Sequence, residues 1–112
     1  MALLSSRHCK PCEGGVEPLL RDEATRLLGQ LSPEWSMSDN GLEIHRDFEF
    51  KGFYQTMAFV NAVAWIANAQ GHHPDLEVGY GHCFVRYTTH AINGLSENDF
   101  ICAARVDGLF SD

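Results

Sequence analysis

The chain has 112 residues, 45% hydrophobic and 21% charged, a composition typical of one globular domain that excludes an intrinsically disordered chain. Eight Lys and Arg residues against 15 Asp and Glu residues give a formal net charge of −7. This disfavours nucleic acid as a partner, because phosphate binding relies on basic side chains. The longest fully apolar run, residues 62–67, is too short to cross a bilayer, and the N-terminus lacks a signal-peptide pattern. We therefore expect a small cytoplasmic protein with no membrane partner.

Residues 1–16 are rich in Gly, Cys and Ser and show no periodicity, so we expect a loosely ordered lead before a single domain over residues 17–112. The lead carries His8 beside a Cys-x-x-Cys pair, Cys9 and Cys12, a spacing found in zinc sites and redox pairs. The chain has no second Cys-x-x-Cys and enough apolar residues for an ordinary core. Reduced thiols without a metal are therefore the favoured interpretation, and a role for the pair stays open.

The remaining sequence alternates between helical and strand periodicity. In chain order we predict a helix from about Pro18, a hairpin with its turn at 39–41, a helix over 53–69, strands at 76–79 and 83–90, and a helix opening at Ser96. In the second strand of the first hairpin, one face should be buried: Leu42, Ile44, Phe48 and Phe50. The order α-β-β-α-β-β-α predicts an α+β domain, in which a four-stranded antiparallel sheet carries three helices on one face.

The helix over 53–69 carries two apolar stripes. The stripe expected in the core contains Phe53, Met57, Val60, Ala64 and Ala67. The second stripe contains Phe59, Val63 and Ile66. A small domain rarely covers so wide an apolar arc by itself, so the second stripe predicts a homodimer or homotetramer formed through this helix.

Three of the six histidines are expected to converge. His72 and His73 lie at the junction between helix 53–69 and the following strand, and His90 ends the partner strand of that hairpin. Because a hairpin returns the chain to its starting end, His90 should lie near the His72-His73 pair. Imidazoles can gain and lose protons near neutral pH, which is the requirement for general acid/base catalysis.

Other interpretations of these residues stay open. Each histidine alone would be explained as a solvated or structural residue. A His₃ zinc site is disfavoured, because adjacent side chains diverge and Pro74 holds His73 in an extended conformation. Asp99 fits a capping box with Ser96, which explains an acid there without catalysis, yet the same carboxylate could orient a histidine or position a substrate.

The residues around the histidines resemble the signature of the pterin-4a-carbinolamine dehydratase family, in its bacterial form. The resemblance covers about residues 17–107. The matching runs are Gly71-His72-His73-Pro74-Asp75, Thr88-Thr89-His90 and Gly94-Leu95-Ser96-Glu97-Asn98-Asp99, with support from Phe48-x-Phe50-Lys51-x-Phe53 and Ala103-Ala104-Arg105.

The resemblance implies a hydro-lyase that dehydrates 4a-hydroxytetrahydrobiopterin, or a similar pterin, to quinonoid dihydropterin and water. Such an enzyme recycles the cofactor of aromatic amino acid hydroxylases and acts alongside one of them. The pterin is the substrate, and neither a cofactor nor a metal is implied. The residues implied in catalysis are His72, His73, His90 and Asp99. The residues implied in pterin binding are Gly71, His72, His73, Thr88, Thr89, His90 and Ala91.

The chemistry of a carbinolamine agrees with this set. The N5 lone pair expels hydroxide from C4a, which needs a proton donor at the leaving oxygen, and a base must then remove a ring-nitrogen proton. Histidines, with an unperturbed pKa of ~6.5, can supply both steps. We expect His73 and His90 to transfer the protons and His72 to bind or orient the substrate. Which histidine is the acid depends on tautomers that the sequence does not reveal.

Two other functions stay open. One is a non-catalytic dimerisation module, because vertebrate members of the family also act as coactivators for a homeodomain transcription factor. The other is a role in molybdopterin metabolism, since neither composition nor spacing distinguishes biopterin from another pterin.

Overall fold

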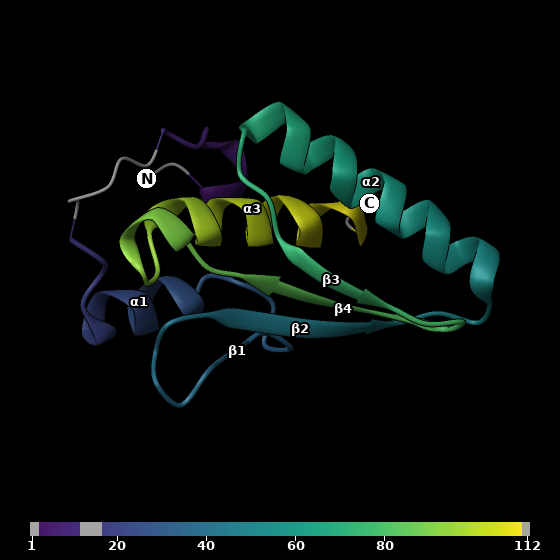
Figure 1. The fold of residues 1–112 in the computed structure, drawn as a ribbon, viewed down its shortest axis with the longest axis horizontal. Helices are drawn as coiled ribbons and strands as arrows, with labels where there is room; N and C mark the ends of the chain where they lie inside the picture. Colours follow the sequence, from purple (N-terminus) through teal and green to yellow (C-terminus); the bar gives the residue numbers. More distant parts are fainter. Residues whose placement is uncertain (1–2, 12–16, 111–112) are drawn as a thin grey trace.

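The computed structural model describes residues 3–11 and 17–110, which form a four-stranded antiparallel sheet and three α-helices. The predicted α+β class and element order are confirmed (Figure 1). In chain order the helices and strands are α1 (Arg21–Leu28), β1 (Ser36–Met37), β2 (Ile44–Glu49), α2 (Phe53–Gln70), β3 (Asp75–Val78), β4 (His82–Tyr87) and α3 (Glu97–Asp107). Short 3-10 turns are η1 (Leu4–Ser6), η2 (His90–Ile92) and η3 (Gly108–Phe110). No helix in the described part of the chain is long and apolar enough to cross a membrane.

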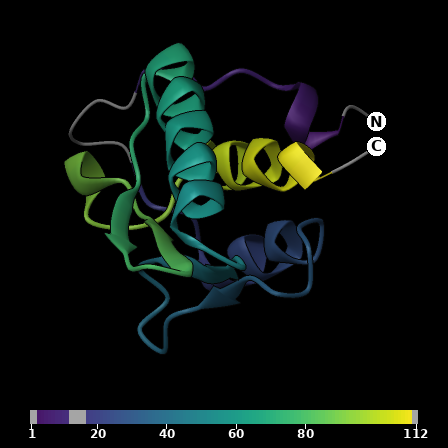
Figure 2. The ribbon, with the colours of Figure 1, turned by 90° about the vertical axis from the view of Figure 1, so that its right-hand side faces the viewer.

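The sheet has the strand order β1-β2-β4-β3, and each neighbouring pair is antiparallel. The central strands β2 and β4 run from the pair Ile44–Tyr87 to the pair Glu49–His82. Helices α2 and α3 lie over the same face of the sheet (Figures 1 and 2). The core forms between these helices and the sheet, and α1 contributes Ala24 and Leu27 to it.

The first hairpin places its buried face almost as predicted. Ile44 and Phe48 are buried and Phe50 is half-buried, but Leu42 precedes the strand and is 45% exposed. The turn explains the difference. The side-chain oxygen of Asn40 accepts hydrogen bonds from the Ser38 hydroxyl at 2.7 Å and from the Leu42 N–H at 3.0 Å. Leu42 therefore belongs to the turn and not to the strand.

Helix α2 buries Ala67 as predicted, but its other buried residues do not belong to the stripe predicted for the core. Its buried residues are Thr56, Phe59, Val63 and Ala67. Phe59 and Val63, assigned from the sequence to a subunit interface, lie in the core, whereas Phe53 is 52% exposed. The helix is apolar nearly all round, so two adjacent stripes have almost the same periodicity.

Thr56 is a polar residue on the buried face of α2. It is fully buried, and its hydroxyl lies 2.9 Å from the Gly52 carbonyl oxygen and 3.0 Å from the Tyr80 carbonyl oxygen. The hydroxyl thereby fastens the start of α2 to the β3–β4 turn. A prediction based only on the spacing of apolar residues does not include this contact.

Two element ends differ from the predictions. The first helix begins at Arg21, because Leu20 is extended and the Leu19 N–H donates to the Leu95 carbonyl oxygen at 2.9 Å. Strand β4 ends at Tyr87 instead of residue 90, because Thr89 pairs with Gly94 and closes a loop. Asn93 in that loop has a positive φ of 54°, a conformation that Asn tolerates better than most residues.

The N-terminal lead, predicted to be loosely ordered, packs against α3 over its described part, residues 3–11. Leu4 is buried in the core. The Arg105 guanidinium donates to the Arg7 carbonyl oxygen, and the Arg7 side chain forms an ion pair with Glu97 at 2.7 Å. These contacts join segments some 90 positions apart, which local patterns do not reveal. Cys12 and the rest of the predicted lead up to residue 16 lie outside the described residues.

Candidate active site

The site begins where α2 ends. Gly71 has a φ of 65°, the left-handed conformation that closes a helix and that glycine adopts without strain. The chain then turns toward β3, and the His72 N–H still donates to the Ala67 carbonyl oxygen at 3.2 Å. His72 is consequently held against the helix end with its side chain turned inward, while the next residue, His73, is exposed.

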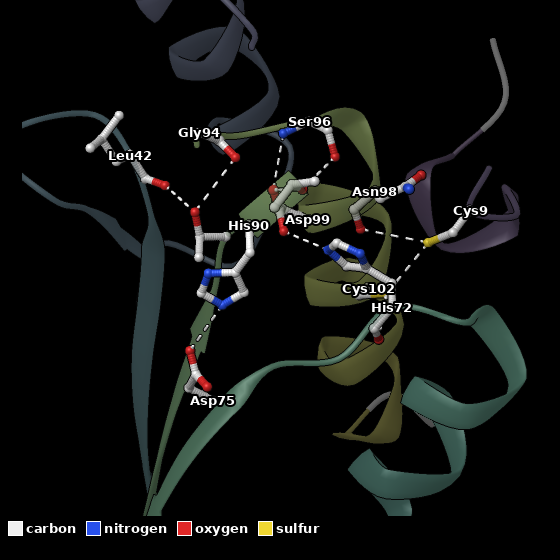
Figure 3. A network of polar contacts seen from close by, with 12 residues as sticks. Cys9, Leu42, His72, Asp75, His90, Gly94, Ser96, Asn98, Asp99 and Cys102 are labelled. Atoms are coloured by element: carbon white, nitrogen blue, oxygen red, sulfur yellow. Dashed lines mark hydrogen bonds and ion pairs between the residues drawn. The ribbon is translucent and has the colours of Figure 1, made fainter. Parts of the chain in front are cut away.

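The loop after β4 brings the third histidine to the same end of the sheet. Thr89 and Gly94 bond to each other through their main chains, and η2 between them carries His90. The His90 side chain is 78% exposed, and its Nε2 lies 3.7 Å from a carboxylate oxygen of Asp75 at the start of β3 (Figure 3). The predicted approach of His90 to the His72-His73 segment is therefore observed.

Asp99 is fully buried at the N-terminal end of α3, and the predicted capping box with Ser96 is present. Its Oδ2 accepts hydrogen bonds from the Ser96 N–H at 3.0 Å and from the Thr89 hydroxyl at 2.8 Å. Its Oδ1 lies 2.6 Å from His72 Nε2 (Figure 3). A buried carboxylate is costly unless it is paired and hydrogen-bonded, and these contacts meet both conditions.

His72 combines burial with a charged partner. Its side chain is 11% exposed, and its ring lies parallel to that of Tyr87, with 6.1 Å between the ring centroids and 9° between the planes. Burial alone would lower the pKa of His72, but the hydrogen bond to Asp99 and the charges of Asp99 and Cys9 raise it above its ordinary value. Because an ionised carboxylate only accepts, Nε2 donates to Asp99, and Nδ1 is the nitrogen left for other contacts.

A cavity of about 260 Å³ lies in front of His72. All seven residues predicted to bind substrate line it: Gly71, His72, His73, Thr88, Thr89, His90 and Ala91. Asp99 lies behind His72 and does not line the cavity. The structure brings the predicted residues together, while their roles in binding and catalysis stay predictions.

Two further lining residues were not predicted, Lys10 from the lead and Asn98 from α3. The Lys10 N–H donates to the Asn98 side-chain oxygen at 3.0 Å, and the Asn98 amide donates back to the Lys10 carbonyl oxygen at 2.5 Å. Asn98 is buried, so this exchange fixes the main chain of the lead at the edge of the cavity. No periodicity or motif in the lead predicts this contact between Lys10 and Asn98.

The other histidines lie elsewhere. His45 stacks on Phe84 with 5.3 Å between ring centroids, and His82 pairs with Asp47 at 3.2 Å, both on the sheet. Over residues 3–11 and 17–110, no group of three or more His, Cys, Asp or Glu side chains is arranged to hold a metal ion.

A larger cavity of about 580 Å³ lies between η1 and the C-terminal end of α3. Its one titratable lining group is Asp107, which is already bound to Arg46 and to the Trp35 indole, each at 2.8 Å. Proton-transfer chemistry is therefore better served by the smaller cavity, where three histidines meet.

The family described as pterin 4 alpha carbinolamine dehydratase matches residues 17–109 of this chain. A protein of Nitrosomonas eutropha with the provisional name pterin-4-alpha-carbinolamine dehydratase is 63% identical over 106 residues, covering 95% of this chain and 92% of the relative.

Two solved structures have a similar fold. One, described as a transcriptional coactivator/pterin dehydratase from Brucella melitensis, is 29% identical with a TM-score of 0.78, covering 83% of this chain and 98% of that chain. The other, described as a pterin dehydratase-like protein and RuBisCO assembly factor in the alpha-carboxysome, is 25% identical with a TM-score of 0.60, covering 70% and 92%. The family match over 17–109 contains every residue that lines the cavity except Lys10.

Proposed function

The chain belongs to the pterin-4-alpha-carbinolamine dehydratase family, and we propose that it dehydrates 4a-hydroxytetrahydrobiopterin, or a closely similar pterin, to quinonoid dihydropterin and water. The observation that carries the proposal is the cavity in which His72, His73 and His90 meet, with His72 fixed by a buried carboxylate. Three imidazoles around one cavity supply the donor and the acceptor that a carbinolamine dehydration needs.

The proposed reaction proceeds by two proton transfers. The N5 lone pair of the pterin expels the C4a hydroxyl group while an imidazolium protonates the leaving oxygen, so that water departs. A neutral imidazole then removes the ring-nitrogen proton, which gives the quinonoid product. We assign these transfers to His73 and His90, whose side chains are exposed at the cavity and can reach a bound substrate.

His72 has a different proposed role. Its Nε2 is bonded to Asp99, so this ring is held in one orientation, and its raised pKa favours the protonated form. A histidine that is held in this way is better suited to orient the pterin by a hydrogen bond than to act as a general acid or base, which must gain and lose a proton in each turnover. Asp99 acts through His72 and is therefore a positioning residue.

We further propose that the reaction needs neither a metal nor a cofactor, and that the enzyme acts alongside an aromatic amino acid hydroxylase. The substrate is the 4a-hydroxylated cofactor that such a hydroxylase releases. A pterin of molybdopterin metabolism remains the alternative substrate, because neither composition nor motif spacing distinguishes biopterin from another pterin.

A binding module is the second candidate function. The names of the two similar structures, one a transcriptional coactivator/pterin dehydratase and the other an assembly factor, support it. The two functions differ in what they require of the histidines, because a docking surface on α2 does not need an intact cavity.

The test is the rate of 4a-carbinolamine loss in a coupled phenylalanine hydroxylase assay, with the protein treated with a chelator and with His90→Ala as the comparison. We expect the chelated wild type to accelerate the loss and His90→Ala to fall by roughly 100-fold or more. His45→Ala, a sheet histidine outside the cavity, is the matched control and should keep wild-type activity. Absence of acceleration by the wild type would overturn the dehydratase proposal and favour a binding role, and loss on chelation would indicate a metal.

A further inference from the structure

A pair of thiols lies directly beside the site. Cys9 of the lead and Cys102 of α3 have their sulfur atoms 3.5 Å apart (Figure 3). The Cys102 thiol also lies 3.9 Å from the His72 carbonyl oxygen, and the Cys9 N–H donates to the side-chain oxygen of Gln70 at 2.9 Å, at the end of α2. Two cysteines 93 positions apart thus meet at the point where the lead, α2 and α3 join.

We propose that Cys9 and Cys102 form an oxidisable thiol pair that closes to a disulfide when a peroxide reaches Cys9, and that this closure changes the charge next to His72. The formation of the disulfide does not depend on the function proposed above. Its effect on His72 bears on the same cavity.

The two thiols divide the roles that such a reaction requires. Cys9 is partly exposed and lies on the surface lead, so an oxidant can reach it, whereas Cys102 is fully buried and immobile within a helix. The hydrogen bond with Cys102 is the main cause that lowers the pKa of Cys9. Burial acts against it, and the positive charges of His72 and Arg105 add to the lowering. The same contact and burial raise the pKa of Cys102. Cys9 is therefore the thiol of the pair that ionises more readily, and we assign it the role of nucleophile.

The chemistry balances with a peroxide as the only oxidant. The Cys9 thiolate attacks one oxygen of hydrogen peroxide, the O–O bond breaks, and a sulfenic acid and hydroxide form. The Cys102 sulfur then attacks the sulfenic sulfur, the S–O bond breaks, and the departing hydroxyl group takes the Cys102 proton and leaves as water. The hydroxide from the first step takes up the proton that Cys9 released when it ionised, which gives the second water. In sum, two thiols and one peroxide give one disulfide and two waters, and the two sulfurs supply the two electrons.

Closure requires only a small movement. The sulfur atoms must approach from 3.5 Å to about 2.05 Å. Cys102 is held by the core, so the movement falls on the lead, where His8 and Lys10 on either side of Cys9 are exposed. The disulfide would then tie the lead covalently to α3 at the edge of the cavity that Lys10 lines.

The consequence for His72 follows from charge. The His72 ring contacts Asp99 from α3 and lies parallel to the ring of Tyr87 from β4, and the charge of Cys9 from the lead also acts on it. Of these, the charge of Cys9 helps to raise the pKa of His72, and a disulfide carries no charge. Oxidation should therefore lower the titration midpoint of His72, while the Asp99 contact keeps the ring in place.

Peptide mapping tests the pairing directly. Trypsin leaves the Lys10–Pro11 bond intact and separates the cysteines into peptide 8–21 with Cys9 and Cys12, peptide 52–86 with Cys83, and peptide 87–105 with Cys102. The full-length Cys12→Ser variant, treated with hydrogen peroxide, should give peptide 8–21 linked to peptide 87–105. Adding Cys83→Ser should leave this product unchanged, whereas adding Cys102→Ala or Cys9→Ser should abolish it.

Two results would overturn the pairing. One is peroxide-treated Cys12→Ser protein with no linked peptide. The other is wild-type protein in which peptide 8–21 closes on itself through Cys9 and Cys12 and never links to peptide 87–105. Because these readouts are chemical, they hold whether or not the protein dehydrates a pterin.

The coupling to His72 has its own readout, the titration of the His72 ring followed by NMR in reduced and oxidised protein. We expect a lower midpoint in the disulfide form, because one nearby negative charge is removed. Reduced Cys9→Ser protein should match the oxidised midpoint, and His82 should not move in any form. An unchanged midpoint for His72 would contradict the coupling even if the disulfide forms.

Discussion

The buried contact between His72 and Asp99 determines the charge at the back of the cavity. The sequence predicted Asp99 through its capping box and left open which histidine it would orient. The structure selects His72, because only that ring turns inward from the end of α2. The lead residues Cys9 and Lys10 could not be placed from sequence, since their contacts with α3 depend on packing between distant segments.

Replacing the carboxylate separates the two opposing effects on His72. In Asp99→Asn the bonds from Thr89 and Ser96 can persist while the charge is lost, so burial prevails and the pKa of His72 should fall below its ordinary value. NMR titration of the His72 ring measures the change. Asp47→Asn, which removes the partner of His82, is the matched control and should leave His72 unmoved. A His72 midpoint that stays raised in Asp99→Asn would show that the carboxylate is not its cause.

The raised pKa also makes stability depend on pH. A group whose folded pKa lies above its unfolded value of ~6.5 contributes stability that is fully present below that value and is lost as pH rises through the folded pKa. Urea unfolding at about pH 5.5 and pH 8.5 should therefore show a larger loss of unfolding free energy for wild type than for His72→Gln. Equal losses in the two proteins would contradict the account.

At the scale of elements, the hydrophobic periodicity predicted every α-helix and strand, but it did not always predict which face of an element is buried or where the element ends. Phe59 and Val63 were placed on an interface and lie in the core, on the same buried face as a polar residue, Thr56, whose hydroxyl contacts two main-chain carbonyl oxygens. Strand β4 ended early, since the pairing of Thr89 with Gly94 depends on a loop that no apolar pattern marks.

Thr56→Val tests whether the Thr56 hydroxyl holds the start of α2. The substitution keeps the volume and leaves the Gly52 carbonyl oxygen bonded to the backbone N–H of residue 56, but it removes the hydroxyl donor to the Tyr80 carbonyl oxygen, so the free energy of unfolding should fall by about 1–2 kcal/mol. Chemical denaturation measures the loss, and Thr25→Val on the exposed side of α1 is the matched control, with a change near zero. Equal effects of the two substitutions would mean that the Thr56 hydroxyl does not fix the helix.

At the scale of the whole molecule, α2 covers the sheet and still presents large apolar side chains outward. Tyr54 and Trp65 are 88% and 75% exposed, and both lie on the helix from which the sequence predicted self-association. The prediction of an interface on this helix stands, but it now rests on different residues, since Phe59 and Val63 are buried within the chain itself.

Light scattering after size exclusion tests the predicted homo-oligomer. Wild-type protein should have the mass of a dimer or tetramer, and Trp65→Glu should lower it, because a charge on the interface must be desolvated without a partner. Leu20→Glu introduces the same charge at an exposed leucine next to α1 and should leave the mass unchanged. A monomeric wild type, or equal masses for both variants and wild type, would contradict an interface on α2.

The central claim is that the histidines at the cavity transfer the protons. The most direct test measures the rate of 4a-carbinolamine loss with two double variants. One carries His73→Ala and His90→Ala, and the other, the control, carries His45→Ala and His82→Ala. We expect the first to approach the uncatalysed rate and the second to match wild type, with both variants keeping the wild-type mass in light scattering. Wild-type turnover by the protein that lacks His73 and His90 would contradict the account.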